Sequence, residues 1–295
     1  VTLIMSQRDE WLSEMEAAAQ AAAKDTGINL TTQDANSDTS KMIQYIESSV
    51  TAGEDAIIIN MVDPETAAQC VEAAGDVPVV FVNRFPGDPS VLNEKAVYVG
   101  SDEMTSGAFQ GEFLAKFFKD QGKTDISYLM LNGILGQTST TNRTASVLKA
   151  LEDNGIKATA AAAPLAADYD RATAMDMISP LLKTTKYDCI ISNNDAMALG
   201  AVEAMQQQGL DPKSVPIVGI DATADGRQAI KDGTLAMTVF QNAEGQGRAS
   251  LQAAANLIDG KPIAEGTGYE VDDENEFIIW VPFEPVTIDN VADYD

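Results

Sequence analysis

The stretch PVVFVNRFP, residues 78–86, is a run of β-branched and aromatic residues that stops at an amide and a guanidinium. Consecutive apolar residues without polar alternation are typical of a strand buried on both faces, as in parallel sheets covered by helices. Asn83 and Arg84 would then lie at the carboxyl end of this strand. A buried strand does not need such residues at its end, so we interpret them as ligand contacts.

Similar strands recur along the chain and alternate with amphipathic helical patterns. VTLIM at 1–5 and AIIIN at 56–60 belong to a first series, and ISYLML at 126–131 and DCIIS at 188–192 belong to a second series that starts after residue 105. Apolar strands separated by helices indicate parallel sheets with helices on both faces. The sequence therefore predicts an α/β protein with two doubly wound parallel-sheet lobes.

The length of the chain indicates how many domains it forms, and its net charge limits the classes of partner that it can bind. The 295 residues suit two domains of ordinary size. Acidic residues number 45 against 19 basic residues, which gives a net charge of -26. Nucleic acids and anionic membrane surfaces would repel such a chain, because both require a basic footprint. We therefore expect no nucleic-acid partner.

The chain lacks residues that several kinds of catalytic site and metal site require. The chain has no histidine, the commonest general base and metal ligand. EGQGRAS at 244–250 has a serine where a dinucleotide loop needs its third glycine, and VDDENEF at 271–277 lacks the ligand spacing of a calcium loop. We predict no enzyme activity, no cofactor and no metal, and we interpret Cys70 and Cys189 as buried free thiols.

Polar side chains follow the predicted strands in both halves. In doubly wound sheets, ligands bind beyond the carboxyl ends of the strands. The residues at these ends are amides, carboxylates, an arginine and aromatics, without a nucleophile beside a base. This set suits a ligand with many hydroxyl groups, whose apolar ring faces stack on aromatic rings. The strand-end residues include Asp9, Trp11, Asn60, Asn83, Arg84, Asn193, Asn194, Asp195, Asp221 and Gln241.

Several of these residues also have purely structural interpretations. Asp195 precedes an apolar helix and is interpreted as its N-cap, which would leave Asn194 to point into a cleft. Asp221 could cap the helix that begins near Ala224. The other structural alternatives are a helix start for Asp9, core packing for Trp11, a surface position for Arg143 and a helix start for Tyr169 and Asp170.

The whole chain resembles the periplasmic sugar-binding proteins of ABC transporters, of the ribose and galactose-binding type. Segments such as IIINMVDPETA, VPVVFVNR, SNNDAMALGAVEAM and TVFQNAEGQG follow one another in the order of that family. FVNRFP, GIDAT, FQNAEGQG and VPFEPVT are most similar to the myo-inositol-binding branch. The residues that the resemblance places at the ligand, together with Gln137, form the predicted ligand-binding set. This set is Asp9, Trp11, Asn83, Arg84, Gln137, Arg143, Tyr169, Asn194, Asp221 and Gln241.

The chain departs from the galactose-binding relatives at defined positions. Gln137 and Ser139 stand where those relatives have histidine and aspartate, and Met5 replaces a tyrosine. The calcium loop of those relatives is missing, since FFKDQGKTDISYL at 117–129 is too short. These departures weaken a glucose or galactose assignment and leave the fold intact.

The resemblance implies three chain crossings between the lobes, near residues 103, 241 and 277. The predicted N-terminal lobe comprises residues 1–103 and 242–276, and the C-terminal lobe comprises residues 104–241 and 277–295. The crossings would form a hinge, and the lobes would close on a ligand held in the cleft between them.

The implied function is extracytoplasmic solute binding. The protein would capture a neutral cyclic polyol, such as myo-inositol, and deliver it to the membrane permease of an ABC importer. The alternatives are a glucose, galactose or other monosaccharide-binding protein, and the core of a ligand-sensing regulator without its DNA-binding domain. We expect a monomer, either periplasmic or a cell-surface lipoprotein, whose export signal is not in this chain. A chemoreceptor is compatible as a further partner.

Overall fold

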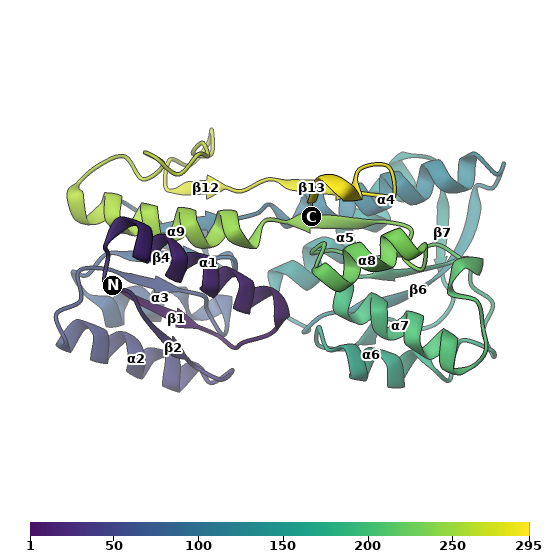
Figure 1. The fold of residues 1–295 in the computed structure, drawn as a ribbon, viewed down its shortest axis with the longest axis horizontal. Coiled ribbons are helices and arrows are strands. Elements are labelled where there is room, and N and C mark those ends of the chain that lie inside the picture. The colour runs from purple at the N-terminus through teal and green to yellow at the C-terminus, as the bar shows by residue number, and fades with distance from the viewer. Residues whose placement is uncertain (295) are drawn as a thin grey trace. The chain divides into compact units, whose positions relative to one another are not determined.

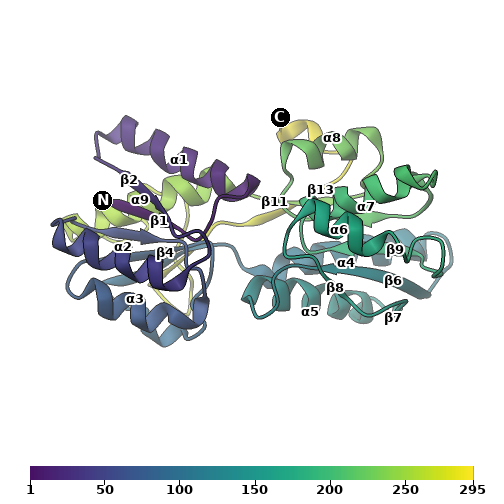
Figure 2. The same ribbon diagram turned by 90° about the horizontal axis from the view of Figure 1, so that it is seen from below.

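The computed structural model describes residues 1–294, which form two compact units. The first unit comprises Val1–Ser101 and Asn242–Pro282, and the second comprises Asp102–Gln241 and the chain from Phe283 onward. Each unit has a parallel β-sheet with helices on both faces (Figures 1 and 2). The predicted α/β fold class is therefore confirmed.

The sheet of the first unit is six-stranded and entirely parallel, in the order β12-β5-β4-β3-β1-β2. Its strands are β1 (Thr2–Met5), β2 (Thr31–Asp34), β3 (Ile57–Ile59), β4 (Val79–Val82), β5 (Ala96–Gly100) and β12 (Ile278–Trp280). Helices α1 (Glu10–Thr26) and α9 (Ala243–Asp259) cover one face, and α2 (Thr39–Thr51) and α3 (Ala67–Ala74) cover the other.

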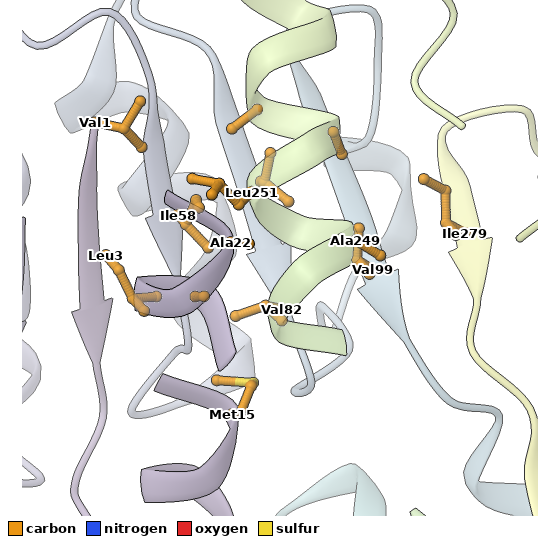
Figure 3. Packing of buried hydrophobic residues seen from close by; sticks show 14 of the residues in the cluster. Val1, Leu3, Met15, Ala22, Ile58, Val82, Val99, Ala249, Leu251 and Ile279 are labelled. Atoms are coloured by element: carbon orange, nitrogen blue, oxygen red, sulfur yellow. The ribbon is translucent and has the colours of Figure 1, made fainter. Parts of the chain in front are cut away.

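Alternate residues of each strand enter opposite hydrophobic layers. Val80 and Val82 of β4 pack in the cluster that contains α1 and α9 residues, among them Leu251 (Figure 3). Val79 and Phe81 pack in the cluster formed with α2 and α3. The uninterrupted apolar run at 79–82 therefore arises because helices bury both faces of the strand.

The second unit has a five-stranded parallel sheet and a separate two-stranded antiparallel sheet. The parallel strands are β6 (Asp125–Asn132), β7 (Lys157–Ala160), β8 (Leu165–Ala166), β9 (Cys189–Ser192) and β10 (Ile217–Val218), and the antiparallel pair is β11 (Thr238–Gln241) with β13 (Phe283–Val286). The helices are α4 (Glu103–Lys119), α5 (Thr138–Asp153), α6 (Arg171–Ile178), α7 (Asp195–Gln207) and α8 (Ala224–Asp232). Short 3-10 helices occur at Pro64–Thr66, Pro89–Val91, Pro212–Ser214 and Val291–Tyr294.

The boundaries between the units differ from the predicted crossings at 103 and 277. The chain changes unit after Ser101, after Gln241 and after Pro282. Residues 277–282 therefore belong to the first unit, because Ile278–Trp280 pairs in parallel with Tyr98–Gly100. The segment FIIWVPFEPVTIDNV contains two strands, β12 and β13, one in each unit.

Glycines allow helices to pack in close contact. A Cβ atom at Gly107 of α4 would lie 2.3 Å from the carbonyl oxygen of Arg143 in α5, and one at Gly111 would lie 2.6 Å from the Val147 carbonyl. Gly200 of α7 and Gly247 of α9 approach the backbones of α6 and α1 in the same way. Larger side chains at these positions would force the helix axes apart.

Two structural features are absent from residues 1–294. No helix there has both the length and the apolar character needed to cross a membrane. No group of three or more histidine, cysteine, aspartate or glutamate side chains in this range is arranged to hold a metal ion.

Both cysteines are predicted to be unreactive in the native protein. Cys70 lies in the first unit and Cys189 in the second, and both are buried free thiols. Burial raises the pKa of the Cys70 thiol to about 11 and raises the pKa of Cys189 well above its ordinary value. At pH 8 we expect no reaction of the folded protein with a thiol reagent and reaction of two thiols in denaturant. An unreduced intact mass lower by two protons would contradict this prediction.

Candidate functional site

A buried amide connects three strand ends of the first unit. The Nδ2 group of Asn60, which follows β3, donates to the Val82 carbonyl at 3.2 Å and to Oδ1 of Asn83 at 3.3 Å. Its Oδ1 accepts from the backbone N–H of Ser6 at 3.3 Å and from the Ser6 hydroxyl at 2.5 Å. Asn60 is therefore an organising residue of this sheet edge, where sequence reasoning noted it as a strand-end residue only.

Asn83 has a left-handed backbone that its neighbours fix. Its φ is 67°, its N–H donates to the Val99 carbonyl at 2.9 Å, and its carbonyl accepts from the Tyr98 hydroxyl at 2.8 Å. A Cβ at Gly100 would lie 1.9 Å from that hydroxyl, so glycine makes room for it. The half-buried Asn83 side chain is thus held in one orientation at the end of β4.

Arg84 holds the adjacent loop. Its Nη1 donates to the carbonyl oxygens of Met61 at 2.7 Å and Val62 at 3.1 Å, just beyond β3. The guanidinium therefore has a structural role, and ligand binding by Arg84 stays a prediction.

Asp9 and Trp11 have the structural roles that the sequence left open. Asp9 caps α1, with its Oδ1 accepting from the Leu12 N–H at 2.8 Å and its Oδ2 accepting from Nε2 of Gln7 at 3.1 Å. Trp11 is 7% exposed and packs in the hydrophobic cluster with α9. Ligand binding by Asp9 and Trp11 stays a prediction.

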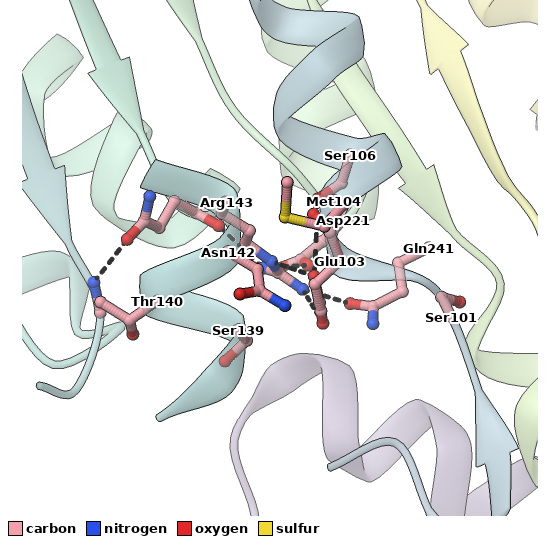
Figure 4. Close-up of polar contacts among 12 residues, drawn as sticks. Ser101, Glu103, Met104, Ser106, Ser139, Thr140, Asn142, Arg143, Asp221 and Gln241 are labelled. Atoms are coloured by element: carbon pink, nitrogen blue, oxygen red, sulfur yellow. Dashed lines mark hydrogen bonds and ion pairs between the residues drawn. The ribbon is translucent and has the colours of Figure 1, made fainter. Parts of the chain in front are cut away.

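The second unit contains a buried polar network around Arg143 (Figure 4). Arg143 Nε donates to Glu103 Oε2 at 2.6 Å, and Nη2 donates to Glu103 Oε1 at 3.0 Å and to Gln241 Oε1 at 3.2 Å. Nη1 donates to the Asn193 carbonyl at 2.8 Å and lies 3.8 Å from Asp221 Oδ1. The predicted residues Arg143, Asp221 and Gln241 are therefore brought together, and the alternative of a surface Arg143 is wrong.

Sequence reasoning missed Glu103. It is the first residue of α4, its side chain is 7% exposed, and its partner lies 40 positions along the chain. Burial alone would lower the pKa of Arg143, but the carboxylates of Glu103 and Asp221 together with Tyr169 raise it above its ordinary value. In the sequence, the one sign of Glu103 was its position directly after Asp102, which is the N-cap residue of α4.

Tyr169 lies against the loop that follows β6. Its hydroxyl is 2.8 Å from both Ser139 Oγ and Thr140 Oγ1, and a Cβ at Gly133 would lie 2.0 Å from its ring. Burial raises the pKa of Tyr169, so its hydroxyl is protonated at neutral pH. The ring is held by these contacts at the start of α5.

Gln137 and Asn194 occupy N-cap positions. Gln137 precedes α5, is 8% exposed and makes no side-chain capping bond. Asn194 caps α7, with its Oδ1 accepting from the Met197 N–H at 3.0 Å. The predicted assignment of the cap to Asp195 was therefore wrong by one residue, because Asn194 has the extended backbone that a cap requires.

Asp195 is instead a buried acceptor. Its Oδ1 accepts from the Thr238 hydroxyl at 2.6 Å and its Oδ2 from the Thr223 N–H at 3.0 Å. Thr223, not Asp221, caps α8. The capping alternative for Asp221 is therefore wrong, and its carboxylate belongs to the Arg143 network.

Left-handed backbone in residues other than glycine occurs only beyond strand ends in the described chain. Asn36 and Ser37 follow β2, Asn83 follows β4, Asp168 and Tyr169 follow β8, and Asp221 and Ala222 follow β10. Such conformations cost on the order of 1–3 kcal/mol each and persist where surrounding contacts impose them. Asn83, Tyr169 and Asp221 are predicted ligand-binding residues, and strain of this kind concentrates at binding sites.

Comparison with known proteins agrees with this architecture. A family model described as a periplasmic binding protein domain matches residues 1–262. The D-galactose/methyl-galactoside binding periplasmic protein MglB of Haemophilus influenzae is 34% identical, over 97% of this chain and 88% of that protein. The ribose import binding protein RbsB of Salmonella typhimurium is 25% identical, over 88% of this chain and 85% of that protein.

A solved structure extends this similarity to the fold. An ABC transporter solute binding protein from Bacillus halodurans, with bound myo-inositol, has a TM-score of 0.82 and 30% identity, covering 99% of this chain and 96% of that one. The predicted family resemblance is confirmed, and this chain belongs to the periplasmic binding protein family.

Proposed function

We propose that this protein is an extracytoplasmic solute-binding protein that binds a neutral cyclic polyol, with myo-inositol as the first candidate. It acts as a monomer and delivers the polyol to the permease of an ABC importer. The observation that carries the proposal is the fixed set of donors and acceptors at the strand ends, above all Arg143, Asp221 and Gln241. Hydroxyl groups donate and accept, so a polyol can bond to amides, carboxylates and guanidinium alike.

The charge arrangement favours a neutral ligand. Arg143 is already paired with Glu103, and Arg84 donates to backbone carbonyl oxygens. A charged ligand would have to leave water, and a guanidinium that pairs with it would have to give up hydrogen bonds that it already makes, which is costly. A neutral polyol requires only hydrogen bonds.

The preference for inositol over a hexose has two supports. The Bacillus halodurans relative was solved with myo-inositol. Gln137 and Ser139 replace the histidine and aspartate expected in galactose-binding relatives, and the Ser139 hydroxyl lies 2.8 Å from the Tyr169 hydroxyl. Galactose stays the second candidate, because MglB is 34% identical to this chain.

A ligand panel tests the proposed function. Thermal shifts would be measured with inositols, hexoses, pentoses and uronic acids, and native mass spectrometry would identify a co-purifying ligand. We expect the largest stabilisation from myo-inositol. Stabilisation by glucose or galactose alone would reject only the inositol choice, whereas no response to any neutral polyol would reject the function.

Replacing Asp9 or Asp221 by alanine is predicted to weaken myo-inositol binding at least about ten-fold, since a charged hydrogen bond is worth about 1.5–3 kcal/mol. Calorimetric titration measures the change. Asp38→Ala is the matched control for Asp9, because Asp38 caps α2 through the same kind of bond, to the Lys41 N–H at 3.1 Å. Wild-type affinity in either variant would remove that residue from the site.

A further inference from the structure

Tyr169 lies in a turn whose main chain is unfavourable for most residues. Asp168 and Tyr169 both have left-handed backbone, with φ values of 54° and 63°. Such a conformation is uncommon in residues other than glycine and persists where surrounding contacts impose it. The turn is anchored on both sides, since the Ala167 N–H donates to the Asn132 carbonyl at 2.9 Å and Asp170 caps α6. The chain therefore keeps an unfavourable turn at the position that carries this aromatic ring.

The hydroxyl of Tyr169 is held between two hydroxyl groups of α5. Its oxygen lies 2.8 Å from Ser139 Oγ and 2.8 Å from Thr140 Oγ1. A phenol group has a single proton, so at least one of these two hydrogen bonds must be donated to Tyr169. Two partners of this kind fix the position of the hydroxyl oxygen at the first turn of α5.

The face of the Tyr169 ring rests on Gly133. A Cβ atom at Gly133 would lie 2.0 Å from Cζ of the ring and 2.3 and 2.4 Å from the two neighbouring ring carbons. These nearly equal distances place the added atom above the plane of the ring, not beside its edge. The φ of Gly133 lies outside the left-handed region, so the main chain there would accept alanine and the ring is what excludes a side chain.

We infer that Gly133, Ser139 and Thr140 are positioning residues, which fix the Tyr169 ring for the ligand and do not contact the ligand themselves. The inference rests on the proposed function, because it takes Tyr169 as a ligand contact. Ser139 and Thr140 lie one turn before Arg143 in the same helix, so the ring and the guanidinium are held in register with each other. A ring that is fixed before binding loses less conformational freedom on binding, and this raises affinity.

The test is a double-mutant cycle on ligand binding. Dissociation constants for myo-inositol and D-galactose would be measured by calorimetry in the wild type, in Ser139→Ala/Thr140→Val, in Tyr169→Phe and in the triple variant. Tyr169→Phe keeps the ring and removes its hydroxyl. We expect the Ser139→Ala/Thr140→Val pair and Tyr169→Phe each to weaken binding about three- to tenfold, because each frees the ring. The triple variant should bind no more weakly than Tyr169→Phe, because the three hydroxyl groups act as one unit.

Gly133→Ala tests the contact with the ring face. The added methyl group would displace the ring, so binding should weaken at least about tenfold. In a Tyr169→Ala background the same substitution should change neither the dissociation constant nor the urea midpoint of unfolding, because the ring is gone. If Gly133→Ala does not fold, the hydroxyl cycle still decides the roles of Ser139 and Thr140.

Ser139→Thr and Ser214→Ala are the controls. Ser139→Thr keeps a hydroxyl group at the first turn of α5 and should therefore keep the ring in place. Ser214 is an exposed residue of the same unit, and its hydroxyl donates to the Asp211 carbonyl at 2.6 Å. Both variants should bind within about twofold of the wild type.

Additive losses would overturn the inference. If the triple variant binds more weakly than Tyr169→Phe by the full factor seen for Ser139→Ala/Thr140→Val, the α5 hydroxyl groups contact the ligand themselves. Wild-type affinity in Ser139→Ala/Thr140→Val would mean that the ring needs no such support, and would overturn the inference as well. Wild-type protein that binds neither probe would instead contradict the proposed function, and the inference with it.

Discussion

Replacing Arg143 by alanine is expected to lower the free energy of unfolding by about 3–5 kcal/mol, because it leaves a buried carboxylate without its partner. Glu103 is 7% exposed and receives two of its hydrogen bonds from Arg143. Urea unfolding followed by circular dichroism measures the change.

Two variants show whether the loss comes from the buried pair. Glu103→Gln in the Arg143→Ala background should restore part of the stability, since it removes the unpaired charge. Arg171→Ala is the control in the same unit, because Arg171 pairs with Glu203 and Asp225 but is 38% exposed. Its loss should cost at most about 1 kcal/mol. Equal losses in Arg143→Ala and Arg171→Ala would contradict the prediction.

Gly107→Val is expected to destabilise the protein by about 3 kcal/mol or more, the upper end of the cost of overpacking. The added atoms would meet the Arg143 carbonyl oxygen at 2.3 Å, and a backbone atom cannot move aside as a flexible side chain can. Separation of α4 from α5 would also pull Glu103 away from Arg143, so myo-inositol affinity should fall as well.

A series of variants measures this effect. Gly107→Ala should lower the free energy of unfolding less than Gly107→Val does, because alanine adds fewer atoms. At an open helix position the same change would instead stabilise the protein by about 1 kcal/mol. Glu112→Ala on the exposed side of α4 is the control and should lie within about 0.5 kcal/mol of wild type. If Gly107→Ala stabilised the protein, α4 and α5 could move apart without cost, and the prediction would be wrong.

The sheet arrangement could be predicted from the sequence because burial on both faces leaves an unmistakable pattern. Val79–Val82 and Ile57–Ile59 are apolar at every position, and each is followed by an amide that lies at the expected sheet edge. The boundary between β12 and β13 could not be predicted in the same way. Ile278–Trp280 and Phe283–Val286 read as one apolar segment, and only their pairing partners assign them to different units.

The polar partners were less predictable than the strands. Glu103 and Arg143 are 40 residues apart, and nothing local marks either as half of a buried pair. Asn194 and Asp195 are both good caps, so the choice between them depends on Thr223 and Thr238, which use the Asp195 carboxylate. Side-chain roles of this kind depend on tertiary contacts that a sequence pattern does not contain.

The left-handed backbone at Asn83, Tyr169 and Asp221 restricts how this protein can acquire a new ligand. Asparagine, aspartate and glycine tolerate such φ values best, whereas β-branched residues rarely adopt them. Mutational drift or laboratory redesign at Asn83 and Asp221 therefore has a short list of acceptable amino acids. Changes of ligand preference would arise more readily at Gln137 and Gln241, whose φ values are not in this region. The conformation of the main chain, rather than the chemistry of the ligand, would then decide which sites vary among descendants.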